Sequence, residues 1–249
     1  MAIIEKYEPG MFSWIELATS DAAAAKTFYT SLFAWEAKDM PIPDGVYTIL
    51  LKNGNDLGAL YQTKEIEPNW ATYISVANVD DSAKKATMLG ATLVAPPFDV
   101  MDLGRMAFVA DPQGATFALW QAKKKAGAAI RDEANTLCWN ELMTSDIEGS
   151  RDFYKGLLGW NLRVSAEYTE IDVNGRPAGG MMQMPNDMRG MPSSWSPYFA
   201  VDDCDAIVAK AKSLGAQVYV PPTDMANVGR FAVLADPQGA AFDVIKLAY

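Results

Sequence analysis

The sequence repeats itself at long range. The segment WIELATSD at residues 14–21 recurs as WNELMTSD at residues 139–146, an offset of 125 positions (139 − 14). A repeat of this length indicates two copies of one structural unit. We therefore predict two homologous domains, at residues 1–123 and 136–249, joined by a linker at residues 124–135. Further pairs share the offset: Phe28-Tyr29 and Phe153-Tyr154, Trp35 and Trp160, Trp70 and Trp195, Pro96-Pro97 and Pro221-Pro222, Gly104-Arg105 and Gly229-Arg230, and the DPQG segments at 111–114 and 236–239.

The offset changes only in one region, between about residues 36 and 69. The half-matching glycines there, Gly58 and Gly179, lie 121 positions apart (179 − 58). We therefore expect compensating differences in loop length between the two copies, because loops tolerate insertions and deletions better than strands or helices do.

Each half is itself doubled. The strand-like segment WIELAT runs into a helical pattern that Asp21 can cap, and TYISVA runs into another that Asn78 can cap. Short strand-like runs follow each helix, for example at residues 46–51 and 105–110. The pattern is therefore βαβββ, four times along the chain, and it predicts an α+β fold.

Composition excludes several classes of function. The net charge of −10 argues against a basic surface for nucleic acid, and we expect neither a secretion signal nor a membrane span. Cys138 and Cys204 are too few for a disulfide framework and indicate a cytoplasmic protein. The chain has no histidine, which excludes Ser-His-Asp and Cys-His catalysis and any imidazole metal ligand.

The two DPQG segments are interpreted as turns. Aspartate at the first position, proline at the second and glycine at the fourth suit a type I β-turn between two strands. Asp111 and Asp236 are therefore assigned to hairpin geometry and not to catalysis.

Alternation along the strands assigns side chains to two faces. In WIELA, Ile15 and Leu17 form an apolar face for the following helix, which leaves Trp14 and Glu16 on the open face. The second copy has Asn140 in place of Ile15, and the pattern gives no reason for it. The same rule, with an internal offset of 57 positions (78 − 21) between modules, adds Tyr73, Ala118, Trp120, Trp139, Glu141, Tyr198 and Asp243 to the open faces.

These features resemble the vicinal oxygen chelate superfamily, which includes glyoxalase I, bleomycin-resistance proteins and extradiol dioxygenases. The segments FSWIELATSDAAAAKTFYTSLFAW and CWNELMTSDIEGSRDFYKGLLGW carry the resemblance, together with the two GR…ADPQG hairpins. It covers nearly the whole chain and implies two tandem glyoxalase-like domains. In that superfamily two paired βαβββ modules form a curved mixed sheet, a cup that surrounds a substrate and often holds a divalent metal.

The resemblance also implies where metal ligands would lie. Seven of the eight positions carry no usual ligand, and Asp243 is the exception. One aspartate cannot hold a divalent ion, so we expect no metal and no other cofactor. The alternative is a site rescued by Glu16 and Glu141. The positions are Trp14, Ala59, Ala71 and Ala118 in the first half, and Trp139, Gly180, Ser196 and Asp243 in the second.

Glu16 and Glu141 are the candidate catalytic groups. A carboxyl group buried beside tryptophan has a raised pKa, which suits a general acid or base near neutral pH. Tyr73 and Tyr198, predicted on the same faces, are candidates to supply a proton or to orient a carbonyl oxygen.

Alternatives accompany each candidate. The glutamates could instead pair with Arg105 or Arg230 and do no chemistry. The open-face tryptophans could stack on a flat or cationic ligand, or simply pack in a core. The candidate ligand-binding residues are thus Trp14, Trp120, Trp139, Ala118, Asp243, Arg105 and Arg230.

Three functions remain open at this point. We favour a protein that binds a small organic molecule, such as a metabolite or antibiotic, in a metal-free cup, with or without turnover. The alternatives are a metal-free isomerase or lyase that uses Glu16 or Glu141, and a metal-dependent glyoxalase-type lyase that detoxifies dicarbonyls. The chain is expected to be a monomeric pseudo-dimer or a homodimer, with Asp243 making the second pocket the more polar.

Overall fold

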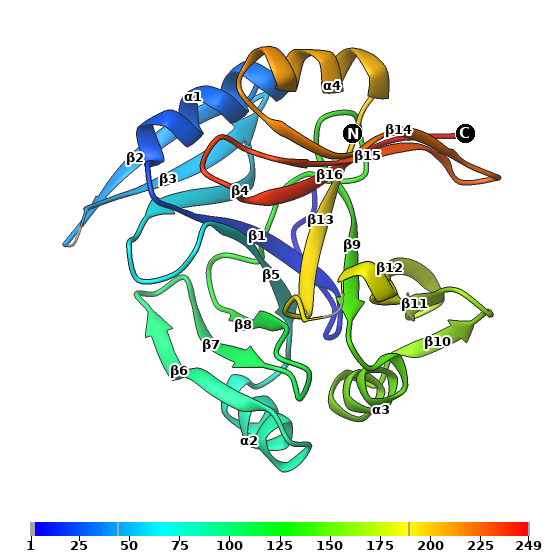
Figure 1. Ribbon diagram of the computed structural model, residues 1–249. Coiled ribbons are helices and arrows are strands. Elements are labelled where there is room, and N and C mark those ends of the chain that lie inside the picture. Colours follow the sequence, from blue (N-terminus) through cyan, green and yellow to red (C-terminus); the bar gives the residue numbers. More distant parts are fainter. Residues whose placement is uncertain (1–2, 44, 189, 249) are drawn as a thin grey trace.

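A computed structural model describes residues 3–43, 45–188 and 190–248. These described residues form two eight-stranded mixed sheets and four α-helices (Figure 1). The first half contains β1 (Phe12–Thr19), α1 (Ala22–Phe33), β2 (Glu36–Ile42), β3 (Gly45–Lys52), β4 (Asn55–Gln62), β5 (Asn69–Ser75), α2 (Val79–Met88), β6 (Thr92–Val100), β7 (Gly104–Ala110) and β8 (Thr116–Ala122).

The second half repeats this order, with one short 3-10 helix added. Within the described residues, no helix is long and apolar enough to span a membrane. The elements are β9 (Leu137–Thr144), α3 (Ile147–Leu158), β10 (Asn161–Val164), β11 (Thr169–Val173), β12 (Arg176–Gln183), η1 (Asn186–Met188), β13 (Ser194–Ala200), α4 (Cys204–Ser213), β14 (Gln217–Met225), β15 (Gly229–Ala235) and β16 (Ala241–Leu247).

Each sheet is built from the two modules of one half. The strand orders are β2-β3-β4-β1-β5-β8-β7-β6 and β10-β11-β12-β9-β13-β16-β15-β14. β1 pairs in parallel with β4 and antiparallel with β5, so β1 and β5 join the two modules at the centre of the first sheet. The predicted α+β fold with four βαβββ modules is confirmed.

The predicted helix starts are confirmed by their capping bonds. The side chain of Asp21 accepts a hydrogen bond from the backbone N–H of Ala24, and that of Asn78 accepts one from Asp81, both at 3.0 Å. Such a bond satisfies one of the free N–H groups at a helix start.

The apolar cores are shared between the two halves. One core joins α1 and its strands to α4 and the strands beneath it, and a second core joins α2 to α3 in the same way. Figure 1 shows the resulting pairs, α1 beside α4 at one end of the molecule and α2 beside α3 at the other. Each half therefore completes the other's core, since an amphipathic helix must bury its apolar stripe.

The two DPQG turns also hold the halves together. Asp236 Oδ1 accepts hydrogen bonds from the backbone N–H groups of Gln238 and Ala240, each at 2.9 Å, as the turn interpretation requires. Its other oxygen accepts the hydroxyl of Tyr29, from the opposite half, at 3.1 Å. The same arrangement joins Tyr154 to Asp111 at 3.0 Å. These aspartates are therefore turn residues that also bind across the domain boundary.

Asn140 has a structural explanation. Its side-chain oxygen accepts a hydrogen bond of 2.8 Å from the hydroxyl of Thr72, which lies in the other half, and both side chains are fully buried. The polar side chain at this position therefore forms a buried hydrogen bond to the opposite half of the chain.

One difference between the halves predicts a stabilising substitution. The hydroxyl of Ser150 donates to Gln113 at 3.2 Å, whereas the matching Gln238 Oε1 is buried and has no partner among the described residues. Ala25 is the counterpart of Ser150 in sequence. We expect Ala25→Ser to raise the free energy of unfolding by roughly 0.5 kcal/mol. The new hydrogen bond to Gln238 stabilises the fold, and the lower helix propensity of serine offsets part of that gain. Chemical denaturation measures it, and Ser150→Ala should shift stability the other way.

Candidate functional site

The open sides of the two sheets gather most of the predicted residues. In the first sheet, Tyr73 lies opposite Trp14 on one side and Ala118 on the other, and Glu16 lies between Ala59 and Ala71. We call this surface the first face. The second face is the equivalent surface of the second sheet, formed by Trp139, Glu141, Ser196, Tyr198 and Asp243.

The first face is filled by its own side chains. Trp14, Tyr73 and Trp120 are buried in one apolar cluster, and Glu16 is only 8% exposed. The linker contributes to this closure, because Ala128 belongs to the cluster and Lys125 accepts a hydrogen bond at its carbonyl from the Trp120 indole, at 2.9 Å. Both tryptophans of the first face are therefore packed in an apolar cluster.

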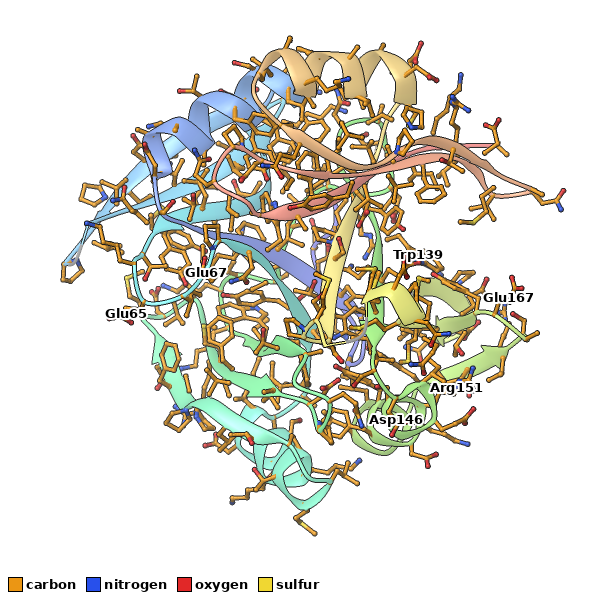
Figure 2. The ribbon with its side chains drawn as sticks, in the orientation of Figure 1. Glu65, Glu67, Trp139, Asp146, Arg151 and Glu167 are labelled. Carbon is orange, nitrogen blue, oxygen red and sulfur yellow. The ribbon has the colours of Figure 1, made fainter. Side chains whose placement is uncertain are left out.

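The second face is more open and more polar. Trp139 and Glu141 are half-buried, whereas their counterparts in β1 are buried. Ser196 and Asp243 stand where the first face has alanines. Figure 2 shows Trp139 on the side of β9 toward the β10–β11 hairpin, near whose tip Glu167 is labelled. The polarity difference follows the direction expected from Asp243.

Both glutamates are held by tyrosine hydroxyls. Tyr168 donates to Glu141 Oε2 at 2.8 Å and Tyr198 donates to Oε1 at 3.0 Å, while the Trp139 indole donates to Tyr168 at 2.9 Å. In the first face Tyr47 donates to Glu16 at 2.5 Å. Burial raises the pKa of both carboxyl groups, and the tyrosine hydrogen bonds oppose this increase.

Tyr47 and Tyr168 were missed by the sequence analysis, although a signal existed. They lie 121 positions apart (168 − 47), the same shifted offset that relates Gly58 to Gly179. Extending that register from the glycines to the tyrosines would have matched them. Each half therefore has a glutamate with two tyrosines close to it.

Gly180 makes room for Tyr168. A Cβ atom at position 180 would lie 1.8 Å from the Tyr168 hydroxyl oxygen. We expect Gly180→Ala to displace Tyr168 from Glu141 and to lower the free energy of unfolding by roughly 1–3 kcal/mol. Urea denaturation measures the loss. Ala59→Gly is the control, because Ala59 occupies the matching position beside Tyr47, and a loss no larger than the control's would contradict this packing.

Asp243 is the most deeply buried acid of the second face. It is 2% exposed, and the Ser196 hydroxyl donates to its Oδ2. No described residue donates to or accepts from Oδ1. Burial raises the pKa of Asp243 well above its usual value, opposed by the Ser196 hydrogen bond, and the nearby charge of Glu141 raises it further. Of the two acids, Asp243 is therefore the one whose surroundings favour the neutral form more strongly.

The raised pKa of Asp243 predicts a pH dependence of stability. The unfolded chain loses this proton near pH 4, whereas the raised pKa means that the folded protein holds it to higher pH, so rising pH favours unfolding until the folded pKa is passed. We expect wild type to lose stability relative to Asp243→Ala as pH rises from 4 to 7. Denaturation of both proteins at several pH values measures this, and parallel stability curves would contradict it.

Arg105 and Arg230 form ion pairs with helix residues, which corrects the expectation that they neutralise Glu16 or Glu141. Arg105 alternates with Met106 of the first-face cluster and points to the helix side, where it pairs with Asp80 at 2.8 Å. Arg230 pairs with Asp205 at 2.7 Å in the same way. Their role is to tie each strand to the helix above it.

Two hollows of the protein surface lie apart from the acids of the second face. The larger, of about 530 Å³, lies between the start of α1 and the β2–β3 hairpin, where Lys26 and Asp39 form an ion pair. The smaller, of about 310 Å³, lies near Arg230 at the ends of β14 to β16. Neither is lined by Glu141 or Asp243.

The chain belongs to the Glyoxalase/Bleomycin resistance protein/Dioxygenase superfamily, whose family model matches residues 11–119 and 135–244. It is 41% identical to "Putative glyoxylase CFP32" of Mycobacterium tuberculosis, over 98% of this chain and 97% of that protein. It is 32% identical to "Anthracycline biosynthesis protein DauV" of a Streptomyces species, over 97% and 95%. The tandem arrangement predicted from the repeat is confirmed by the two matched segments.

The fold is also similar to that of a Mn(II)-bound glyoxalase from Novosphingobium aromaticivorans. The TM-score is 0.69 at 14% sequence identity, and the match covers 96% of this chain and 82% of that one. At this identity the similarity shows the fold alone.

The residues of this chain do not fit a divalent metal on either face. Among the described residues, no group of three or more Cys, Asp or Glu side chains is placed to hold one. At position 180, one of the implied ligand positions, the Tyr168 hydroxyl already fills the space a side chain would need. Glu141 and Asp243 supply only two carboxyl groups, and both oxygens of Glu141 already accept tyrosine hydroxyls.

Proposed function

We propose that the chain binds a small organic molecule on the second face, without a metal, through Asp243 and Glu141. One observation carries the proposal: Asp243 is 2% exposed, yet its Oδ1 has no partner among the described residues. Oδ1 is not among the fully buried atoms that lack a hydrogen-bond partner, so it keeps contact with solvent and is open to a hydrogen bond with a ligand.

The two acids would divide their roles. Asp243 would present its proton to an acceptor atom of the ligand, because burial favours its neutral form. Glu141, held by Tyr168 and Tyr198, would carry the negative charge. The names of the relatives, a glyoxylase and a protein of anthracycline biosynthesis, support a small organic molecule as the ligand.

The first face has no ligand-binding role in this proposal. Its cluster is closed by its own aromatic side chains and by the linker. The domains at residues 1–123 and 136–249, with their shared cores, would then form a self-contained pseudo-dimer with one working site.

A ligand screen with matched variants tests the proposal. A ligand that binds the native state raises the melting temperature, so hits from a metabolite and antibiotic library are identified by thermal shift. We expect Asp243→Ala, which gives the second face the residue of the first, to abolish the shift. Glu16→Gln, to which the proposal assigns no role in binding, should retain it. Hits that survive Asp243→Ala would contradict the proposal.

A second candidate function, proton transfer to and from the bound molecule, is favoured by the same acid pair. Two carboxyl groups with different environments can serve as general acid and general base. Turnover by wild type of a ligand from the screen, lost in Glu141→Gln with binding retained, would support an isomerase or lyase. Unchanged ligand after prolonged incubation would leave binding alone as the function.

A further inference from the structure

The first face contains a cation supplied by the chain itself. The ammonium group of Lys125, in the linker, lies 5.0 Å from the centroid of the Trp14 ring and pairs with Asp56. A cation at this distance from an indole face is attracted by the ring's quadrupole. The linker that closes the first face therefore also places a primary ammonium group against its tryptophan.

Among the described residues, no such cation lies over the tryptophan of the second face. Trp139 is the counterpart of Trp14, and no described lysine or arginine lies over its ring. The ion pairs of the described residues include neither Glu141 nor Asp243, so no described residue supplies a counter-ion within ion-pair distance of these two acids. An uncompensated, half-buried carboxylate favours a positively charged partner.

The hydrogen bonds of the second face lead to the same ligand chemistry. The hydroxyls of Tyr168 and Tyr198 both donate to Glu141, and the Trp139 indole donates to Tyr168. The Ser196 hydroxyl donates to Asp243. These donors are used internally, so the groups that the face has left for a ligand are mainly acceptors. The face thus suits a donor-rich ligand and repels an anion.

Apolar side chains surround the acids. Val233 lies beside Asp243 in the neighbouring strand, and Phe231 lies beside Ile245. Phe231 and Val233 are half-buried, so both keep surface that a ligand can cover.

We infer that the ligand of the second face carries a protonated amine on an apolar or aromatic skeleton, with the ammonium group over Trp139 and close to Glu141, as Lys125 lies over Trp14. This inference rests on the proposed function, since it names the class of molecule that the proposed site takes. At the first face, the ammonium group of Lys125 thus has the position that we assign to the ammonium group of the ligand at the second face.

Matched trios of probes test the inference. Indole, naphthalene and phenyl skeletons each carry a two-carbon arm that ends in an amine, an alcohol or a carboxylate, and ligand-observed NMR titration at neutral pH gives the affinities. We expect the amines to bind at least about tenfold more tightly than the matched alcohols and carboxylates. Glu141→Gln should remove this preference, and Glu16→Gln should leave it unchanged.

The outcomes separate the inference from the proposed function. If alcohols or carboxylates bind as tightly as amines and Asp243→Ala abolishes that binding, the amine assignment is wrong while the site stands. If amine binding is insensitive to both Glu141→Gln and Asp243→Ala, the site itself is wrong. If no amine of the three skeletons binds at millimolar concentration, the amine assignment is also overturned.

Discussion

Asp236→Ala is expected to lower the free energy of unfolding by about 3 kcal/mol or more. The substitution leaves the buried N–H groups of Gln238 and Ala240 without acceptors and removes the partner of Tyr29 from the opposite half. The loss is large because one side chain serves both the turn and the domain boundary. Urea denaturation monitored by circular dichroism measures it.

Two substitutions calibrate this result. Asp111→Ala should cost about as much, since Asp111 makes the equivalent bonds in the other half. Asp21→Ala removes only an exposed helix cap and should cost about 1 kcal/mol. If Asp236→Ala were no more destabilising than Asp21→Ala, the aspartate would not be a cross-domain contact of any importance.

Glu141→Gln is expected to weaken binding of the tightest ligand from the screen by about tenfold to a hundredfold. The substitution keeps the shape of the side chain and removes its charge. The two tyrosines can still pair with the amide, so stability should change by less than about 1 kcal/mol. Isothermal titration calorimetry at neutral pH measures the affinity.

The control lies in the other half. Glu16 has the same sequence context and is held by Tyr47, but the first face is filled. Glu16→Gln should therefore leave affinity unchanged. Equal losses in the two variants would show that the substitutions act through the fold and not through a site.

The local patterns of the sequence were sufficient to predict the framework. Asp21 and Asn78 cap the helices as expected because a cap depends on a few neighbouring residues. Strand alternation placed Trp14, Glu16 and Tyr73 on one face because the side-chain period of a strand is fixed. These are short-range rules, and the repeat made each of them visible twice.

The site depends on longer-range features. Tyr168 enters through a hairpin of different length, where the main repeat offset no longer applies. Lys125 and Ala128 looked like linker, yet their backbone and side chains pack against the first sheet. Arg105 points to the helix side of the sheet because it bonds to Asp80, which follows the cap residue Asn78. The repeated pair Asp205 and Arg230 could have indicated this contact from the sequence. None of these contacts follows from neighbours in sequence.

Calorimetric titration of chelator-treated protein with the tightest ligand addresses the central claim most directly. If one half of this molecule has kept an open acidic surface while the other has closed, the titration should give one site per chain. Its affinity should not change when manganese, nickel or zinc is added back, and Glu141→Gln should weaken it at least about tenfold. Binding that appears only with an added metal ion, or two equivalent sites per chain, would contradict the account.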